Sequence, residues 1–413
     1  MNIFRVIKKQ RELANNPGLL DTSLLKANAF TRRRVGGMNF PETLSFMLDM
    51  RKTTIQTRLN QFYRHVKGGD PISQPAFTKL RAQFNHKPFE AMVREIVEEE
   101  YSGQYELPTW HGFHLLADDG SYLQLPMTPE LAEEYGVRGG RPSAGISVLY
   151  DVLHGWVLDP IITHTDMNER EQMKNHIAYL REQLPYIANN ALLLLDRGYP
   201  SQEILTWLED QGLRFCIRCQ NNFTIEAREA PLGSSDITFK SGQTLRVVKL
   251  PLPGGEVETL ITNLFDLPQE DYQELYARRW GIETLYFRLK QIVGVEKFSG
   301  KTPNSIRQDF WASMVLINNA AVLQKEADDA VAEHQKTKNN KHFYRARSSD
   351  LIVIMRDRFI FATLCRKPEF TRIEFNAIMR ELARAVSPVR PGRHFPHIPK
   401  PHAAAKHNLK SSL

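Results

Sequence analysis

Four polar residues between positions 276 and 290 have the types and the spacing of a set that could do chemistry together. They lie in the segment LYARRWGIETLYFRLKQIVGV and are Tyr276, Arg279, Glu283 and Lys290. At roughly 100° per residue, they fall within an arc of about 60° on one predicted helix and form a polar stripe. An apolar stripe lies beside it and consists of Leu275, Ile282, Leu285, Leu289 and Ile292. The helix can therefore pack through its apolar stripe and keep the polar set at the edge of the core.

Two interpretations of the polar stripe remain open from the helix alone. Tyr, Arg, Glu and Lys side chains aligned on one face could be exposed ion pairs that each stabilise the helix only slightly. Alternatively, Glu283 binds a metal ion and its three neighbours bind a phosphate-rich ligand. Arg supplies a fork of donors and Lys a compact charge, and both suit phosphate.

Two aspartates are expected at the ends of strands. Asp119 closes the predicted strand HLLADD before a Gly-Ser pair, and Asp196 closes ALLLLD before an Arg-Gly pair. Each could simply begin a turn, because Asp-Gly and Asp-x-Gly are ordinary turn signals. Asp196 is more informative, since a carboxylate directly after a continuous apolar run must reach solvent or a cation. With Glu283 they supply three oxygen ligands of the kind that Mg²⁺ or Mn²⁺ prefers, as two-metal phosphoryl transfer requires.

The segments that carry the aspartates predict a mixed sheet covered by helices. GFHLLADD and SYLQLP read as strands, and GISVLYDVLHGWVLDPIITH reads as two strands joined by a turn at His154 and Gly155. A helix over NEREQMKNHIAYLREQL then leads into ALLLLD, which is typical of a strand buried on both faces. The following segment, PSQEILTWLEDQG, predicts a helix with Ser201 as its N-cap and Gly212 at its end.

Beyond this region the pattern changes twice. Residues 214–265 predict a β insertion, with candidate strands RFCIRC, FTIEAR, ITFK, TLRVVKL and VETLITNLF, and residues 268–325 are helical again. After position 386 the chain is rich in Pro, His, Lys and Arg and has no acidic residue. Such a tail cannot bury enough apolar surface to order itself, so we expect it to be disordered.

The N-terminal part is predicted to be helical and basic. Three short helices are expected over PETLSFMLDM, TTIQTRLNQFYRHV and SQPAFTKLRAQF, with Ser73 as N-cap of the third. Lys79 and Arg81 lie on neighbouring faces of that helix, which could recognise DNA. A helical support domain with a solvated basic face is the other interpretation, because the GGDP connection is longer than a tight helix-turn-helix turn.

Composition sets the broad class. The chain has 413 residues, of which 42% are hydrophobic and 24% charged, and this excludes a largely disordered, collagen-like or membrane-embedded protein. The net charge of +7 favours a polyanionic partner, with nucleic acid first. Three cysteines are too few for a disulfide framework. We find no export signal or bilayer-spanning run, and expect a cytoplasmic protein without a membrane partner.

Two smaller patterns are assigned no role. Cys216 and Cys219 form a C-x-x-C on a predicted strand, where residues three apart point to opposite faces, so a metal clasp or redox pair is not expected. His164 and Asp166 could be a ligand pair, but a His near a strand end is usually only hydrogen-bonded.

The spacing of Tyr276, Arg279, Glu283 and Lys290 resembles the C-terminal signature of bacterial insertion-sequence transposases of the insertion-sequence-four type. These are cut-and-paste DDE enzymes with a ribonuclease H-like core. All four positions of the signature are present.

The aspartates fit the same resemblance. In that family the first catalytic Asp lies in an Asp-Gly-Ser or Asp-Gly-Thr motif, which matches Asp119 rather than Asp118, and the second matches Asp196 in DRGY. Three motifs in the family order, on a predicted strand, strand and helix, are jointly specific. The similarity covers roughly 107–325, and 38–100 more loosely.

The resemblance implies a fold and a division into domains. The fold class is α/β, a ribonuclease H-like mixed sheet flanked by helices, with a β-strand insertion and an all-α N-terminal domain. A helical DNA-binding domain would span 1–105 and the catalytic domain 106–325, interrupted by the β insertion at about 214–265. A C-terminal helical region with the basic disordered tail would span 326–413.

The resemblance also implies a function. The enzyme would bind terminal inverted repeats in double-stranded DNA, cleave at the element ends and join the 3′-hydroxyls to target DNA. It would act as a homodimer in the DNA complex, in the cytoplasm and on the nucleoid. Two Mg²⁺ or Mn²⁺ ions would be held by Asp119, Asp196 and Glu283, the catalytic residues, and the DNA backbone would be gripped by Tyr276, Arg279 and Lys290. Alternatives are a metal-dependent nuclease without end joining and a catalytically silent DNA-binding derivative.

The chain departs from the family in one respect. In relatives a Trp of the β insertion stacks on a flipped base, but no Trp occurs here between Trp207 and Trp280. Phe223, Phe239 or Phe265 could take its place.

Overall fold

The computed structural model divides into two compact units. It describes the residues 2–27, 29–30, 36–101, 107–220, 223–252, 255–336, 342–359 and 368–389. The first unit comprises Met1–Glu100, Leu123–Ala144 and Phe287–Leu413, and the second comprises Tyr101–Tyr122 and Gly145–Tyr286. Both units combine separate parts of the chain, so they do not test the three consecutive functional domains that the sequence predicts. The functional boundaries near 105 and 325 therefore stay predictions, and most of the basic tail lies outside the described residues.

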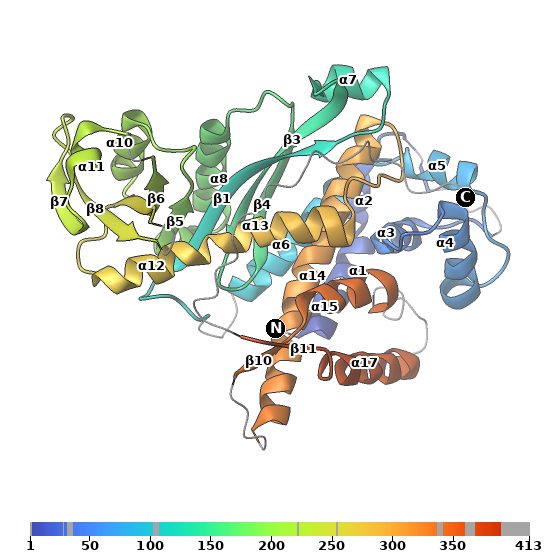
Figure 1. The fold of residues 1–413 in the computed structure, drawn as a ribbon. Coiled ribbons are helices and arrows are strands. Elements are labelled where there is room, and N and C mark those ends of the chain that lie inside the picture. The colour runs from blue at the N-terminus through green and yellow to red at the C-terminus, as the bar shows by residue number, and fades with distance from the viewer. Residues whose placement is uncertain are drawn as a thin grey trace. The chain divides into compact units, whose positions relative to one another are not determined.

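The central strands have the predicted order. They are β1 (His114–Gln124), β3 (Arg141–Asp151), β4 (Trp156–Thr163) and β5 (Ala191–Leu195). β3 and β4 are antiparallel, and the predicted turn between them contains Gly155 with φ +80°. β1 is parallel to β5, as Figure 1 shows. The sequence predicted two strands on either side of Gly120, whereas the structure has the single strand β1 there, because pairing continues through the Asp-Gly-Ser motif.

β5 is the most deeply buried strand of the second unit. All five of its residues are buried. It pairs in parallel with β1 on one side and with β6 (Arg214–Cys219) on the other. Two parallel neighbours leave no exposed edge, which explains the uninterrupted run of apolar residues. The prediction of a buried strand is confirmed.

The predicted β insertion extends this same sheet. Among the described residues the sheet has nine strands in the order β2-β3-β1-β5-β6-β9-β8-β7, with β4 paired to β3. The added strands are β7 (Gly233–Thr238), β8 (Thr244–Pro251) and β9 (Val257–Thr262), and the short β2 covers Val137–Arg138. The segment FTIEAR was predicted as a strand, but it forms the helix α11 (Ile225–Glu229), because the Thr224 hydroxyl accepts a hydrogen bond from the Ala227 N–H and caps it.

Helices of the second unit follow the predicted caps. They are α8 (Glu169–Gln183), α9 (Pro185–Ala188), α10 (Gln202–Asp210), α12 (Gln269–Arg278) and α13 (Trp280–Phe287). Asn168 caps α8, and Ser201 caps α10 as predicted. Figure 1 shows α12 and α13 following one another along nearly the same direction.

The single helix predicted across positions 276–290 is in fact interrupted. α12 ends at Arg278, α13 ends at Phe287, and the π-helix η2 (Arg288–Val293) follows. A π-helix has a different number of residues per turn, so the angle of 100° per residue does not hold up to Lys290. Lys290 also belongs to the first unit, whereas Glu283 belongs to the second. The prediction that all four polar residues lie on one face of a single regular helix is therefore wrong.

The first unit is mainly helical, as predicted for the N-terminal part. The three expected helices are confirmed as α3 (Phe40–Leu48), α4 (Ile55–Phe62) and α5 (Gln74–Arg81), the last capped by Ser73. The other helical elements are α1 (Ile3–Ala14), α2 (Pro17–Ser23), η1 (Tyr63–Lys67), α6 (Lys87–Tyr101), α7 (Pro129–Tyr135), α14 (Pro303–Gln335), α15 (Ser348–Ile354), η3 (Met355–Phe359) and α17 (Pro368–Leu382). The strands β10 (Tyr344–Ala346) and β11 (Val386–Pro388) pair with each other.

Arg81 has a structural contact that its place beside Lys79 did not suggest. Arg81 is only 3% exposed. Its Nε donates to the Gln308 side chain at 3.0 Å, and its Nη2 donates to Asp309 Oδ1 at 3.0 Å. Both partners lie on α14, so Arg81 joins α5 to α14 inside the first unit. It does not present its charge to DNA, whereas Lys79 is exposed.

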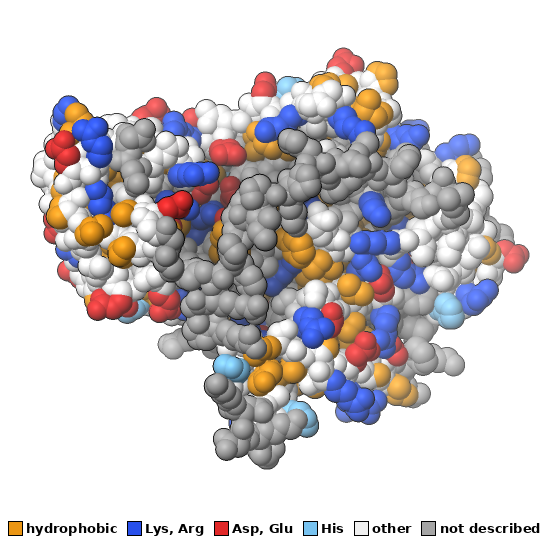
Figure 2. All heavy atoms as spheres, viewed as in Figure 1, with side chains coloured by type: hydrophobic (Ala, Val, Ile, Leu, Met, Phe, Trp, Pro, Cys, Tyr) orange, Lys and Arg blue, Asp and Glu red, His pale blue; other side chains and the backbone are white. Residues whose placement is uncertain are grey.

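The surface charge is mixed. On the face drawn in Figure 2, Lys and Arg side chains form several separate groups with acidic side chains among them. Within the described ranges, none of the helices is both long enough and apolar enough to cross a membrane.

Candidate active site

The parallel pairing of β1 and β5 brings the two predicted aspartates to one edge of the sheet. Ala117 lies opposite Leu194 in the last described pair of the two strands. Asp119 and Asp196 each follow two residues later, so they lie at equivalent positions just beyond the paired parts of the two strands. Asp119 lies within β1, not at its end as predicted, but it does lie beyond the part of β1 that pairs with β5.

Asp119 carries a strongly perturbed carboxyl group. Its pKa is raised to about 7, first by burial and then by the negative charges of Asp196, Glu169 and Asp118, while Arg279 acts in the opposite direction. One carboxylate oxygen accepts the N–H of the next residue in the chain at 2.9 Å. Burial disfavours the charged form of the carboxylate, and the neighbouring carboxylates act in the same direction.

The neighbouring Asp118 points into the interior instead. It is 0% exposed, and the Ser147 hydroxyl donates to its Oδ1 at 3.3 Å. The same hydroxyl lies 3.0 Å from His176 Nε2, and His176 Nδ1 lies 2.7 Å from Asp159 Oδ2. Burial raises the pKa of Asp118 to about 6 against the opposite effect of His176. This enclosed network has no access to a substrate, which supports the choice of Asp119 over Asp118.

Asp196 is held by the turn that follows β5. Its Oδ1 accepts the N–H of Gly198 at 2.6 Å. A Cβ at position 198 would lie 3.1 Å from the same oxygen, so the close approach of the carboxylate favours glycine there. The turn interpretation of DRGY and its catalytic interpretation are thus compatible, because the turn orients the carboxylate.

Arg279 is the cation among these carboxylates. It is 7% exposed and forms an ion pair with Glu283 one helical turn later. Its guanidinium carbon lies 5.7 Å from the centre of the Tyr276 ring. Burial alone would lower the pKa of Arg279, but Tyr276, Glu283, Asp119 and Asp196 together raise it. The structure therefore brings five of the six predicted site residues into one electrostatic group.

Tyr276 is more enclosed than a surface stripe would require. It is 6% exposed, and burial raises the pKa of its hydroxyl above its ordinary value. Neither this hydroxyl nor Arg279 Nη1 has a hydrogen-bond partner among the described residues. Two buried donors do not agree with the interpretation in which the polar stripe consists of exposed ion pairs. The sixth residue, Lys290, lies in the first unit, and the contacts described above do not include it.

Glu169 is a carboxylate of this group that sequence reasoning missed. A Cβ built on Gly120 would lie 2.5 Å from Glu169 Oε1, and a Cβ on Gly198 would lie 3.7 Å from Glu169 Oε2. Its carboxylate thus lies beside the residue after Asp119 and the second residue after Asp196. In the sequence it is only an acidic residue in the first turn of a helix, which is common and carries no special signal.

The residue types suit a divalent metal, but the cage is not assembled. In the part of the chain that the structure describes, no three His, Cys, Asp or Glu side chains lie close enough to hold an ion. Carboxylate oxygens are nevertheless the ligands that Mg²⁺ and Mn²⁺ prefer. Burial and the neighbouring carboxylates raise the pKa of Asp119, and a bound cation would favour its charged form. The donor set therefore fits such an ion, with Glu283 still paired to Arg279.

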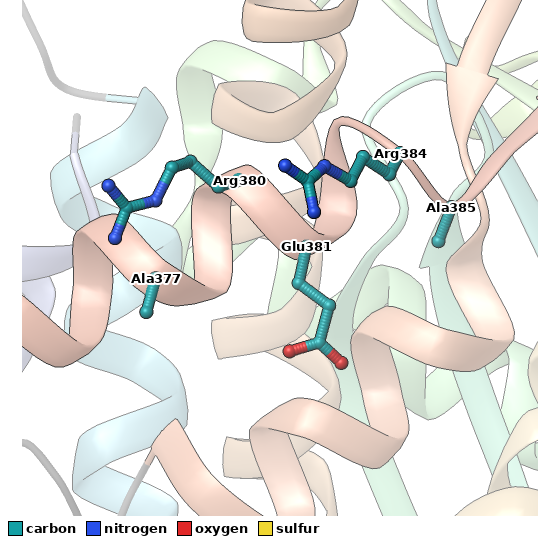
Figure 3. A pocket seen from close by; sticks show the side chains of 5 residues that line it. All are labelled: Ala377, Arg380, Glu381, Arg384 and Ala385. Atoms are coloured by element: carbon teal, nitrogen blue, oxygen red, sulfur yellow. The ribbon is translucent and has the colours of Figure 1, made fainter.

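Two pockets are lined by residues other than these carboxylates. One in the second unit, with a volume of about 500 Å³, is lined by Arg197, Arg218, Cys219, Gln220, Gly255, Glu256 and Val257, and so begins next to Asp196. One in the first unit, of about 540 Å³, is lined by Ala377, Arg380, Glu381, Arg384 and Ala385 (Figure 3). Neither lining includes a predicted site residue.

The candidate stacking residues differ in exposure. Phe239 is 3% exposed, whereas Phe265 is 37% exposed and has the Arg246 guanidinium 5.8 Å from its ring centre. Phe223 has intermediate exposure. Phe265 is thus the most accessible of the three.

Comparison with known proteins finds similarity to transposases. A family model described as a transposase DDE domain matches residues 115–319, which include all six predicted site residues. The chain is 25% identical over 316 residues to the transposase InsG for insertion sequence element IS4 of Escherichia coli (strain K12). That alignment covers 71% of this chain and 69% of InsG.

Further relatives agree. The chain is 26% identical over 147 residues to the putative transposase y4zB of Sinorhizobium fredii (strain NBRC 101917 / NGR234), covering 31% of this chain and 41% of y4zB. Among solved structures, it is similar to the piggyBac transposase in its synaptic complex with hairpin DNA, with a TM-score of 0.52 and 12% identity. That match covers 94% of this chain and 87% of the other. It concerns the fold alone and confirms the predicted α/β class with a ribonuclease H-like mixed sheet.

Proposed function

Because this chain belongs to the DDE transposases of the insertion-sequence-four type, we propose that it performs cut-and-paste transposition of its element. It is an enzyme, and its family binds DNA and depends on divalent metal ions. In the proposed reaction it binds the terminal inverted repeats, cleaves at the element ends and joins the freed ends to target DNA. The observation that carries the proposal is the shared edge of β1 and β5, where Asp119 and Asp196 meet the Arg279 and Glu283 pair.

We assign the metal ligands to three carboxylates. Asp119, Asp196 and Glu283 would hold two Mg²⁺ or Mn²⁺ ions. When bound, such ions activate an attacking hydroxyl and stabilise the leaving oxygen of a phosphodiester. The protein contributes the fixed positions of the two aspartates, which the β1–β5 register and the Gly198 N–H determine.

Arg279 and Tyr276 are proposed to receive a DNA phosphate, together with Lys290. Arg279 is paired with Glu283 here, and a phosphate offers its guanidinium an alternative partner that can accept a fork of hydrogen bonds. The unpartnered Nη1 of Arg279 and the hydroxyl of Tyr276 are donors available to such a ligand among the described contacts. Binding of DNA would then release the carboxylate of Glu283 from Arg279 and leave it available as a metal ligand.

The two chemical steps are a hydrolysis and a transesterification. Water attacks the phosphodiester at the element end, the bond to the leaving 3′-oxygen breaks, and that oxygen takes up a proton to become the 3′-hydroxyl. This hydroxyl next attacks a target phosphodiester, forming one bond as another breaks. Neither step requires ATP, because hydrolysis of a phosphodiester is favourable and the transesterification replaces one phosphodiester by another.

The proposed assembly contains two chains and two element ends. Both ends must be joined to one target, which requires them to be held together during the reaction. The place of action is the bacterial nucleoid in the cytoplasm, where chromosomal target DNA lies.

A strand-transfer assay tests the function against its alternatives. Paired end DNA, target DNA and Mg²⁺ are incubated with the full-length chain, and cleaved and joined products are separated by size. A transposase yields both products. Cleavage without joining identifies a nuclease, and end binding without cleavage identifies a silent DNA-binding derivative. The matched control is Asp119→Ala, which should bind ends without cutting them.

A further inference from the structure

We propose that Glu169 is a fourth carboxylate of the metal site, acting with Asp119 and Asp196. This inference rests on the proposed function, since it extends the same site. Glu169 is the first residue of α8, the helix that follows the β3–β4 hairpin, and it belongs to none of the three sequence motifs. The ligand class is a divalent cation that prefers oxygen donors.

The first observation is the approach of Glu169 to both aspartate motifs. A methyl group on Gly120 would come within 2.5 Å of Glu169 Oε1, which is closer than real contacts allow. The φ of Gly120 lies outside the left-handed region, so the backbone there does not itself demand glycine. A side chain at position 120 would therefore displace the Glu169 carboxylate from its present place. The carboxylate also extends toward Gly198, in the turn that holds Asp196.

The second observation is an unsatisfied hydroxyl beside the same carboxylates. Tyr199 is 0% exposed, and its hydroxyl has no hydrogen-bond partner among the described residues. Burial raises its pKa well above the ordinary value, and the negative charges of Asp118, Asp119 and Glu169 act in the same direction. A buried donor without a partner is costly. A water or phosphate oxygen in the site would satisfy it.

Helix α8 is anchored so that Glu169 keeps this position. The Asn168 side chain caps the helix and accepts the N–H of Arg170 at 3.0 Å. Arg170 Nη2 in turn donates to the carbonyl oxygens of Gly198 at 3.3 Å and Pro200 at 3.2 Å. The first turn of α8 is therefore tied to the loop that carries Asp196. Such support is what a ligand needs to be held in place.

A purely helical role for Glu169 does not explain its direction. Acidic residues in a first turn stabilise the helix dipole wherever they point. Glu171 in the same turn does so with a side chain that is 59% exposed and lies 3.1 Å from Lys174 Nζ. Glu169 instead extends toward Gly120 and Gly198, beside the two aspartate motifs. An oxygen donor in this position can contribute to a cation site together with Asp119 and Asp196.

The experiment measures Mn²⁺ binding to the full-length protein without DNA, from the electron paramagnetic resonance signal of free Mn²⁺. We expect Glu169→Gln to weaken Mn²⁺ binding by about tenfold or more. Glu171→Gln removes the same charge from the same turn and should leave the affinity unchanged. Glu169→Asp keeps the charge on a shorter side chain and should give an intermediate affinity. Circular dichroism verifies that each variant is folded.

The outcomes separate this inference from the proposed function. If Asp119→Asn and Asp196→Asn weaken Mn²⁺ binding but folded Glu169→Gln does not, Glu169 is not a ligand and the inference is overturned alone. If none of the three changes the affinity, the proposed metal site is overturned as well. Equal losses in Glu169→Gln and Glu171→Gln would indicate a general charge effect and would also overturn the assignment. If Glu169→Gln is unfolded, Glu169→Asp decides the question, and unchanged binding in that variant contradicts the inference.

Discussion

Asp119, Asp196 and Glu283 should each be indispensable for cleavage. Their replacement by Ala removes one oxygen donor from the proposed metal site and should lower Mg²⁺-dependent cleavage by at least about a hundredfold. Binding of end DNA should be nearly unchanged, because none of the three is proposed to contact it. Cleavage is measured on end DNA and binding by gel shift. A variant that cleaves normally would remove its residue from the site, and a parallel loss of binding would indicate misfolding.

The acidity of Asp119 should be visible in the stability of the metal-free protein. Its pKa is raised to about 7 in the folded chain, whereas the unfolded chain ionises the same group near pH ~3.9. Between these values the folded protein holds a proton that the unfolded chain has released, so rising pH favours unfolding. Asp119→Asn cannot ionise. Relative to the wild type it should gain stability from about pH 4 to about pH 7 and keep a constant gain above that.

Melting temperatures in EDTA across this pH range test the expectation. Addition of Mg²⁺ should reduce the gain, because the wild type then has a cation beside the carboxylate. A difference between the two proteins that grows toward low pH would have the wrong sign and would contradict the burial of Asp119 among like charges.

At the scale of elements, the α12–α13 segment is expected to contact DNA through Arg279. Arg279→Ala should weaken the complex with cleaved ends and reduce the slope of log affinity against log salt by about one for each phosphate that the variant no longer neutralises. The neighbouring Arg278 is the control, since its guanidinium lies 2.5 Å from Glu274 on the exposed face of α12. Arg278→Ala should change the slope little. Equal slopes in the wild type and the Arg279 variant would favour a structural role for the Arg279 and Glu283 pair.

Lys290→Ala is a separate variant of the same kind. Lys290 lies in η2 of the first unit, and its proposed contact with a DNA phosphate predicts that this variant reduces the salt slope by about one. A slope reduced by about one would assign Lys290 to a phosphate. An unchanged slope would show that the family spacing is preserved here without a phosphate bound to this lysine.

The contact between α5 and α14 predicts opposite behaviour for two basic residues of one helix. Arg81→Ala leaves Asp309 without its buried partner and should destabilise the protein by about 3 kcal/mol. Lys79→Ala should leave the free energy of unfolding unchanged, because the side chain is exposed. If α5 recognises DNA, Lys79→Ala should weaken end binding without changing stability. Urea unfolding and gel shifts measure the two properties, and a stable Arg81 variant would contradict the buried network.

At the scale of the whole molecule, the reaction requires two element ends to be held at once. We expect the active complex to contain two chains, each of 47.6 kDa, and two end DNAs. Sedimentation of the full-length chain with end DNA measures this composition. Wild type mixed with Asp119→Ala should yield products joined at one end only. Complete two-end joining by a complex with one chain would contradict the proposed assembly.

Much of the secondary structure follows from local patterns in the sequence. Ser73 and Ser201 cap helices where predicted, and ALLLLD forms a buried strand ending before Asp196. Caps, turns and periodicity act between residues a few positions apart, so they can be read without knowing the fold. The same holds for the spacing of the polar residues around Glu283, which predicted the family.

Other features depended on contacts between distant parts of the chain. The continuation of β1 past Asp119 reflects pairing in the sheet, and the direction of Glu169 reflects the packing of α8 against two turns. Arg81 looked like a surface cation because its partners on α14 lie more than two hundred residues away. FTIEAR had the composition of a strand, and a single cap at Thr224 made it a helix.

The sequence by itself therefore determined the order of most elements and the family, and it predicted which residues carry the chemistry. The tertiary structure alone decided that Asp119 and Asp196 leave one sheet edge in equivalent positions, that Arg279 lies among the carboxylates, and that Glu169 joins them. The physical reason is the range of the interactions. Local hydrogen bonds and periodicity are encoded within a few residues, whereas strand register and the meeting of charges depend on how the chain closes long loops and buries its apolar faces.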